Sequence, residues 1–180
     1  GIRGDRVASV GDLSGARATT EIDAGGKAVA PGFINVLSWA NESLIADGRA
    51  MSDLKQGVTL EIMGEGESGG PLNDAMKADV LKHQGDIKYA IDWTTLGEFL
   101  DSLVRRGISL NVASFVGATS VRVHVLGEDD RDPTPAELLQ MQQLVRQAMR
   151  EGALGVGSSL IYAPAFFAET PELVALAQAA

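Results

Sequence analysis

The chain has 180 residues, of which 45% are hydrophobic and 22% are charged, a composition typical of a globular domain. Its formal net charge of -9 argues against binding to nucleic acid or to an anionic membrane, because both select clustered Lys and Arg. There is no cysteine, which excludes disulfides, thiolate catalysis and cysteine-ligated zinc within this chain.

The start of the sequence does not resemble a signal peptide. Gly1–Val7 lacks the apolar stretch of a signal peptide, and no apolar run approaches the roughly 18 residues that span a bilayer. The chain has no initiator Met, and it stops at Ala180 inside a helical pattern that begins at Thr170. We therefore expect processing or truncation at the start and a continuation of the sequence elsewhere. The compartment, cytoplasmic or periplasmic, stays open.

Residues 6–30 have the pattern of short strands joined by tight turns. Alternating segments lie over Arg6–Val10, Thr19–Ile22 and Lys27–Ala30, and Gly, Asp and Pro bound each of them. This pattern is typical of β-hairpins.

After Pro31 the chain repeats one order of elements: apolar strand, loop, amphipathic helix, glycine, next strand. The predicted strands are Phe33–Leu37, Val58–Met63, Ile108–Val116 and Ala153–Val156. Glycine comes directly before the last three of them, where the left-handed conformation ends a helix at least cost.

Three helices are predicted between and after these strands. Thr134–Glu137 is a capping box with Pro at the first helical position, and apolar residues follow at helical spacing. A second apolar stripe runs from Leu96 to Leu103, and a third helix begins at Thr170.

Repeated β-α units predict an α/β fold with a parallel sheet. A closed eight-fold barrel needs about 250 residues, so this chain is expected to hold the first half of one. Half a barrel leaves two open sheet edges. We therefore expect the second half of the barrel elsewhere, as another chain of the same particle or further along the same protein.

Several segments carry a resemblance to the amidohydrolase superfamily. Ile22–Ile34, with Pro31-Gly32-Phe33-Ile34 at its end, resembles the entry to an amidohydrolase barrel. The order and spacing of the later segments are similar to the N-acyl-D-amino-acid deacylase (D-aminoacylase) family: Gln56–Thr59, Asn111–Ser114, Pro133–Met141, Gly152–Gly155 and Leu160–Pro164.

The resemblance implies both a fold and a reaction. Residues 1–30 would be part of a small β-sandwich, and residues 31–180 would be the first four or so β/α units of a metal-dependent (β/α)8 TIM barrel. The reaction would be hydrolysis of a non-peptide C–N bond, the amide between an acyl group and a D-amino acid. A divalent metal, zinc by resemblance, would generate hydroxide and polarise the carbonyl. The catalytic carboxylate and two histidine ligands would lie beyond residue 180.

The chain departs from the family pattern at the metal. Leu37 and Trp39 stand where the family has two histidine ligands, and Gly66 stands at the position of a bridging cysteine. Glu65 and Glu67 lie in the same glycine-rich turn, and either carboxylate can bind a metal through oxygen. The alternative is a pair of solvated loop acids, or acids hydrogen-bonded to nearby backbone N–H groups.

Two further residues match the family pattern near the substrate. The Tyr162 phenol is a candidate hydrogen-bonding group for the substrate, against plain loop packing. Arg122 is a candidate substrate contact, against an ion pair with Glu128 or Asp129. His83 is expected to be exposed. His124, which alternates with Val123 and Val125 after a predicted strand, is expected to be a surface or partly buried structural histidine, with a position near the barrel rim as the alternative.

The sequence is compatible with three functions. The preferred one is a D-aminoacylase-like hydrolase of a small N-acyl amino acid, with a rebuilt metal centre or a metal held mainly by the missing half. The second is a catalytically altered relative that acts as a binding or scaffold protein. The third is a hydrolase of other amides, such as dipeptides or cyclic amides.

Overall fold

The computed structural model describes residues 1–180, which form two compact units, Gly1–Pro31 and Gly32–Ala180. The first unit contains one small hairpin, in which β1 (Ile2–Arg3) pairs antiparallel with β2 (Arg6–Val7). Gly4 lies in the turn with φ 62°, a left-handed conformation that glycine adopts without steric cost.

The prediction of strands over Thr19–Ile22 and Lys27–Ala30 is wrong, and the first predicted strand ends at Val7, before Val10. An extended segment becomes a strand only when a neighbouring strand takes its backbone hydrogen bonds. No other segment pairs with these two, and the side chains of Ile22 and Val29 are exposed.

The second unit is built on parallel strands that lie side by side in chain order. β3 (Phe33–Asn35) pairs with β4 (Val58–Met63), and β4 pairs with β5 (Asn111–Ser114). Beyond Phe115 the chain continues as β6 (Val116–Gly117), which pairs with β7 (Val156–Gly157). Hydrogen bonds on both sides of the break, from Leu154 N to Ser114 O and from Val116 N to Gly155 O, connect the two sheets.

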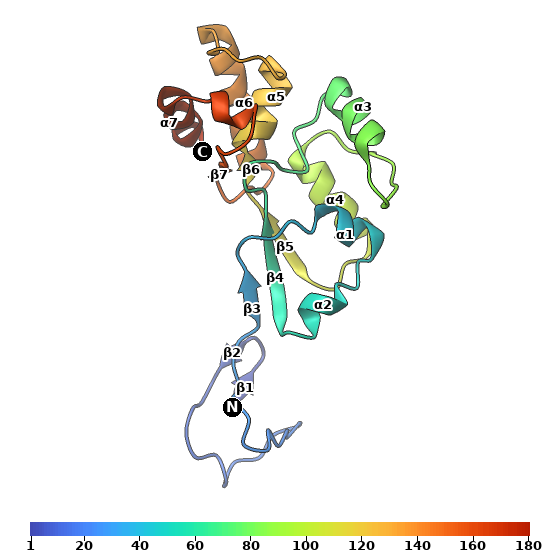
Figure 1. Ribbon diagram of the computed structural model, residues 1–180. Coiled ribbons are helices and arrows are strands. Elements are labelled where there is room, and N and C mark those ends of the chain that lie inside the picture. Colours follow the sequence, from blue (N-terminus) through green and yellow to red (C-terminus); the bar gives the residue numbers. More distant parts are fainter. The chain divides into compact units, whose positions relative to one another are not determined.

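Helices connect β3 to β4, β4 to β5, and β6 to β7. Figure 1 shows α1, α2 and α4 on one side of the β3–β4–β5 sheet, with no element on the other side. None of the helices has the length and apolar character needed to cross a membrane. The helices are α1 (Asn41–Ala46), α2 (Met51–Leu54), α3 (Asp74–His83), α4 (Leu96–Arg106), α5 (Ala118–Leu126), α6 (Pro135–Arg150), a 3-10 turn (Ala165–Phe167) and α7 (Thr170–Ala179).

The core lies between the strands and the helices. Along β4, Glu61 and Met63 are buried, whereas Leu60 and Ile62 on the opposite face are only partly buried. The alternation follows from the period of two in a strand. One face therefore packs on helices and the other stays open. The buried core includes Met63, Phe99, Leu103, Val121, Met141, Val145 and Leu176.

Side-chain caps fix two of the longer helices. The predicted capping box of α6 is confirmed, with Thr134 and Glu137 each accepting a hydrogen bond from the other's backbone N–H. Thr95 and Glu98 form a second capping box at α4. His124 lies on α5, after strand β6, and is partly buried.

Candidate functional site

The turn after β3 is attached to β4 through one residue, Ser38. Its N–H donates to the carbonyl oxygen of Ile62 at 2.8 Å, and its hydroxyl donates to Glu61 Oε2 at 2.6 Å. The hydroxyl also accepts from the N–H of Ala40 at 3.2 Å. Because Ser38 points into the core, its neighbours Leu37 and Trp39 are left 52% and 63% exposed.

The glycine-rich loop after β4 lies directly against the start of α5. The hydroxyl of Ser68 accepts from the N–H of Gly117 at 2.9 Å, and the carbonyl oxygen of Gly66 accepts from the N–H of Thr119 at 2.9 Å. A Cβ on Gly117 would overlap the Gly66 carbonyl oxygen, so the two backbones touch. The loop that carries Glu65 and Glu67 is therefore fixed by its backbone.

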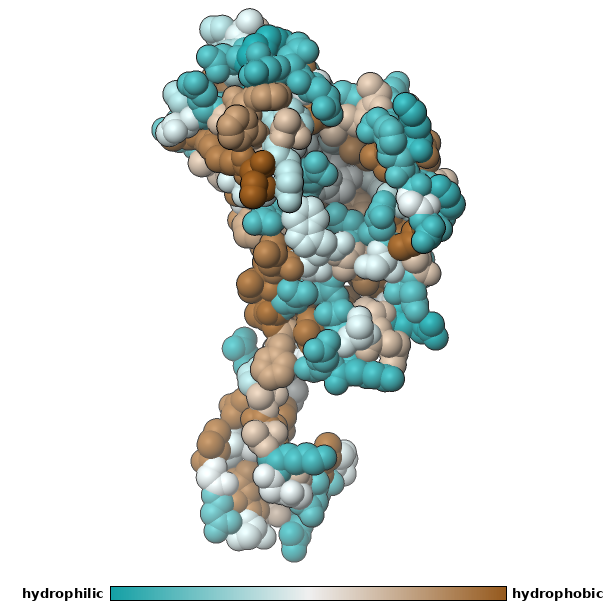
Figure 2. All heavy atoms as spheres, in the orientation of Figure 1, coloured by the Kyte–Doolittle hydropathy of each residue, from teal (hydrophilic) through white to brown (hydrophobic).

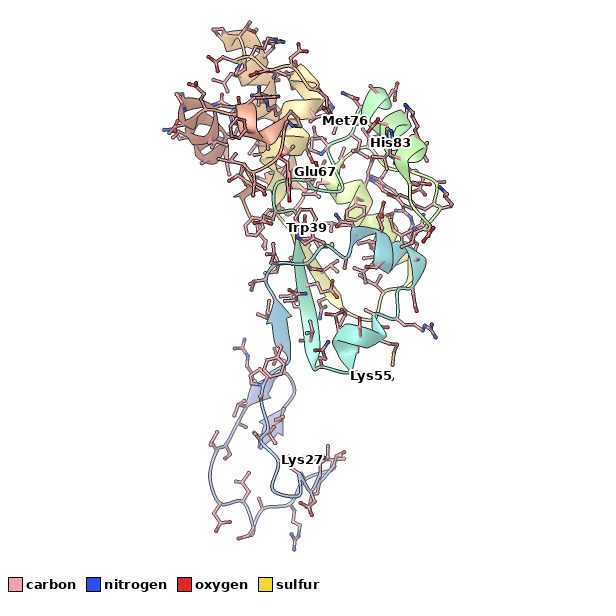
Figure 3. All side chains as sticks on the ribbon, viewed as in Figure 1. Lys27, Trp39, Lys55, Glu67, Met76 and His83 are labelled. Carbon is pink, nitrogen blue, oxygen red and sulfur yellow. The ribbon has the colours of Figure 1, made fainter.

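A hollow of about 310 Å³ lies at the carboxyl ends of the strands. Glu65 is the one ionisable residue in its wall, and the other contributors are apolar side chains or glycine. In Figure 3, Trp39 and Glu67 are labelled in this region, beyond the ends of β3 and β4. The lining residues are Val36, Leu37, Ile62, Met63, Glu65, Phe115, Val156 and Gly157.

The proposed metal ligands do not come together as a metal site. Glu65 lines the hollow and is partly buried, whereas Glu67 is exposed and is absent from that wall. No three His, Cys, Asp or Glu side chains of the 180 residues converge on one point. Leu37 has no donor atom for a metal, so the residues of this chain do not by themselves fit a divalent ion.

Arg122 is completely buried, with 0% of its surface exposed. Its guanidinium donates to Glu172 Oε2 at 2.5 Å and to the carbonyl oxygens of Asp129 and Arg131 at 3.2 and 2.7 Å. The ion-pair partner is thus Glu172, which corrects the expected pairing with Glu128 or Asp129. Burial raises the pKa of Glu172, and the Arg122 charge opposes that rise. The guanidinium has no free surface for a ligand, and its role as a substrate contact stays a prediction.

The remaining candidates lie outside the hollow. Tyr162, 74% exposed, follows β7 and does not line the hollow, so its contact with substrate stays a prediction. His83 is exposed, as expected, and its Nδ1 lies 3.0 Å from Asp79. His124 borders a second hollow of about 160 Å³ between α4, α5 and α6. Burial lowers the pKa of His124.

Sequence reasoning missed Glu61, a carboxylate only 1% exposed in the middle of β4. Its Oε2 binds Ser38, while its Oε1 is buried without a hydrogen-bond partner. Carboxylates are rarely buried without a hydrogen-bonding partner, because removing one from water costs on the order of several kcal/mol. A signal existed: Glu61 is the one charged residue of β4 and lies two residues before Met63, on the face that packs against the helices.

Known proteins resemble this chain over nearly all its length. No protein-family profile matches it. D-aminoacylase of Alcaligenes xylosoxydans xylosoxydans is 34% identical over 178 residues, which cover 97% of this chain and 36% of that protein. N-acyl-D-glutamate deacylase of the same organism is 32% identical over 182 residues, covering 100% of this chain and 37% of the relative.

Solved structures agree with these relatives. A D-aminoacylase described with a binuclear metal centre superposes with a TM-score of 0.80 at 32% identity, covering 99% of this chain and 38% of that one. N-acyl-D-glutamate deacylase from Bordetella bronchiseptica, in complex with zinc and a phosphonate inhibitor, has a TM-score of 0.81 at 29% identity and the same coverage. The chain spans little more than a third of the length of these relatives.

Proposed function

Because the chain is homologous to little more than a third of the length of the D-aminoacylases, which are amidohydrolases, we propose that it supplies part of a hydrolase that cleaves the amide bond of N-acyl-D-amino acids. The observation that carries the proposal is the fold match, because a TM-score of 0.80 over 99% of the chain places its strands and helices in the order found in an enzyme of this family.

The architecture we infer for the complete protein is a (β/α)8 barrel, to which residues 31–180 contribute the first half. Parallel strands in chain order with helices on one face support it. The opposite face, exposed along β3, is the face that would line such a barrel. A second half, in the same polypeptide or another chain, would then cover that face and close the open edges.

The part of the reaction that this chain performs is inferred from its own residues. Active sites of such barrels lie at the carboxyl ends of the strands, where Glu65 and the apolar hollow lie here. Glu65 can accept a hydrogen bond from a substrate N–H, while the apolar wall excludes water from the amide. The groups that move protons belong, in this proposal, to the second half.

The metal dependence of the relatives is the point of disagreement. Leu37 and Trp39 do not fit a metal, and we propose that any divalent ion of the complete protein is held mainly by groups outside these 180 residues, with Glu65 as the one candidate ligand from this hollow. Glu67, which is exposed, is a less favourable candidate. Elemental analysis of the purified protein, compared with Glu65→Gln and Glu67→Gln, tests this directly.

The presence of Leu37 and Trp39 at the ligand positions also favours a second function, that of a binding protein. Replacement of two ligand positions by Leu37 and Trp39 also suits a relative that binds N-acyl amino acids without hydrolysing them. A hydrolase of dipeptides or cyclic amides stays a third alternative, which substrate profiling separates from the first.

The deciding experiment is a hydrolysis assay on the purified protein with any partner chain that it carries. A panel of N-acetyl-D-amino acids and their L enantiomers is incubated with and without added zinc, and chiral chromatography measures the free amino acid. Release of D-amino acid above the rate for the L enantiomer supports the proposal. A folded protein that releases neither enantiomer under both conditions would contradict it and favour the binding protein.

A further inference from the structure

Glu65 is carried by a segment of chain with little stiffness of its own. Glycine lies on both sides of it, with φ of 91° at Gly64 and 72° at Gly66, a region of backbone conformation that glycine enters freely. The segment borders the open face of the sheet, where Figure 2 shows apolar side chains gathered along β3. Glu65 therefore keeps one position only if other contacts within this chain hold its neighbours.

On the amino-terminal side, Glu65 follows directly on the end of β4, which is fixed. The N–H of Phe115 donates to the carbonyl oxygen of Met63 at 2.8 Å. A Cβ on Gly64 would overlap the carbonyl oxygen of Phe115 at 2.2 Å, so the two backbones are in contact. The chain between β5 and β6 thus holds the residue before Glu65.

On the carboxyl-terminal side, the side chain of Ser68 makes the attachment, and this residue is 9% exposed. Its hydroxyl accepts from the N–H of Gly117 at 2.9 Å and donates to the carbonyl oxygen of Gly70 at 2.5 Å. Its N–H donates to the hydroxyl of Ser120 at 2.9 Å. Gly117 is the N-cap of α5 and has no side chain to cap the helix, so the loop supplies an acceptor there.

The turn between Glu65 and Ser68 is short enough to transmit this attachment. The N–H of Glu67 donates to the carbonyl oxygen of Glu65 at 2.8 Å, and the carbonyl oxygen of Gly66 accepts from the N–H of Thr119 at 2.9 Å. Without the Ser68 hydroxyl, the buried N–H of Gly117 would lose its acceptor, which is costly enough to shift the loop or the helix start.

We infer that Ser68 is a positioning residue, which sets the place of the Glu65 carboxylate at the carboxyl end of β4 by attaching its loop to α5. This inference rests on the proposed function, in which Glu65 contacts the substrate amide or a metal. The groups that hold the loop all belong to this chain, so the second half of the barrel is not needed to place Glu65.

The first test follows amide hydrogen exchange by NMR on the purified protein with any partner chain. Ser68→Ala should speed exchange of the Glu67 and Thr119 N–H groups about fivefold or more, because one hydrogen bond that closes the loop is lost. The matched control is Ser102→Ala on α4, since Ser102 is 1% exposed and its hydroxyl donates to the carbonyl oxygen of Phe99 at 2.7 Å, outside the loop. The control should leave exchange of the two N–H groups within about twofold.

The second test asks whether Ser68 acts through Glu65. In the hydrolysis assay, Ser68→Ala should lower kcat/KM about tenfold or more, because a small displacement of a group at the reacting bond has an effect of this size. Ser68→Thr, which keeps the hydroxyl, should restore most of the activity. In the Glu65→Gln background, Ser68→Ala should change kcat/KM by less than about twofold, since the carboxylate that it positions is already absent. Ser102→Ala should leave kcat/KM unchanged in both backgrounds.

The outcomes separate this inference from the proposed function. Unchanged exchange in Ser68→Ala overturns the positioning role, whether or not the protein is a hydrolase. An equal loss of kcat/KM in the two backgrounds overturns the action through Glu65 and keeps the hydrolase. Faster exchange in a protein that hydrolyses nothing keeps the attachment of the loop and rejects the proposed function. If Ser68→Ala does not fold, Ser120→Ala, which removes the acceptor of the Ser68 N–H, takes its place with the same expected results.

Discussion

Replacing Arg122 by Met should destabilise the protein more than any exposed substitution. The guanidinium is 0% exposed and donates to Glu172 and to the carbonyl oxygens of Asp129 and Arg131. The two carbonyls lie in an exposed segment, where water can replace the lost donor. Glu172 has no such replacement, since it is itself buried. Removing one partner of a buried ion pair costs about 3–5 kcal/mol.

The measurement is urea unfolding of Arg122→Met at pH 7, followed by circular dichroism. With a slope of about 2 kcal/mol/M, a loss of about 4 kcal/mol lowers the midpoint by roughly 2 M. The double variant Arg122→Met, Glu172→Met should recover most of the loss, because no buried charge is left. Arg105→Met, at an exposed position of α4, is the control and should change the free energy of unfolding by less than about 0.5 kcal/mol.

The pH dependence gives a second check on the same variant. Burial raises the pKa of Glu172, and removal of Arg122 removes the charge that opposes this rise. A carboxyl with a raised pKa in the folded state binds its proton more tightly folded than unfolded, so its destabilising effect appears as pH rises. The loss caused by Arg122→Met should therefore be smaller near pH 4 than near pH 8. A loss below about 1 kcal/mol at pH 7, with activity nevertheless abolished, would refute the structural role and favour a substrate contact.

Two further predictions concern backbone contact and capping. Gly117→Ala should cost about 1–3 kcal/mol in the free energy of unfolding, measured by urea. The φ angle of −72° suits alanine, but the added Cβ would overlap the backbone of Gly66 and Glu67. An unchanged urea midpoint would contradict this close contact. Hydrogen bonds from Arg131 and from Thr134 lower the pKa of Glu137 from 4.5 to about 2, so its favourable contribution is present above pH 4.5 and is lost as pH falls toward 2. An NMR titration should place the Glu137 midpoint near 2 and Arg131→Met should raise it, whereas a midpoint near 4.5 in the unmodified protein would rule out the pairing.

Local signals in the sequence were enough for much of the second unit. The predicted strand Val58–Met63 coincides with β4, and the capping box at Thr134 begins α6 where expected. Both predictions use only residues that are close in the sequence: the strand comes from its alternating pattern, and the helix start comes from a capping pair three residues apart. The predicted strand Ile108–Val116 is shorter in the structure, because Ile108 to Leu110 form no ladder and the chain breaks at Phe115.

The candidate site depended on contacts that a single sequence does not contain. Arg122 and Glu172 are 50 residues apart, and nothing local relates them. The same holds for Ser38 and Glu61, which are 23 residues apart. Glu65 was identified from its loop, but its apolar surroundings come from other strands.

The hydrogen bond between Ser38 and Glu61 has a consequence for the pairing of β3 with β4. The register of these strands already shifts between Phe33 and Ile34, so the ladder alone does not define it. A slip of β3 by one residue would remove Ser38 from Glu61 and leave a carboxylate in the apolar layer with no hydrogen bond at either oxygen. The mispaired sheet would be strongly destabilised by the buried carboxylate without hydrogen bonds, whereas the hydrogen bond in the native pairing adds little to the free energy of unfolding. We therefore expect Glu61 to act on folding fidelity, as the feature that rejects wrongly aligned strands during assembly of the sheet.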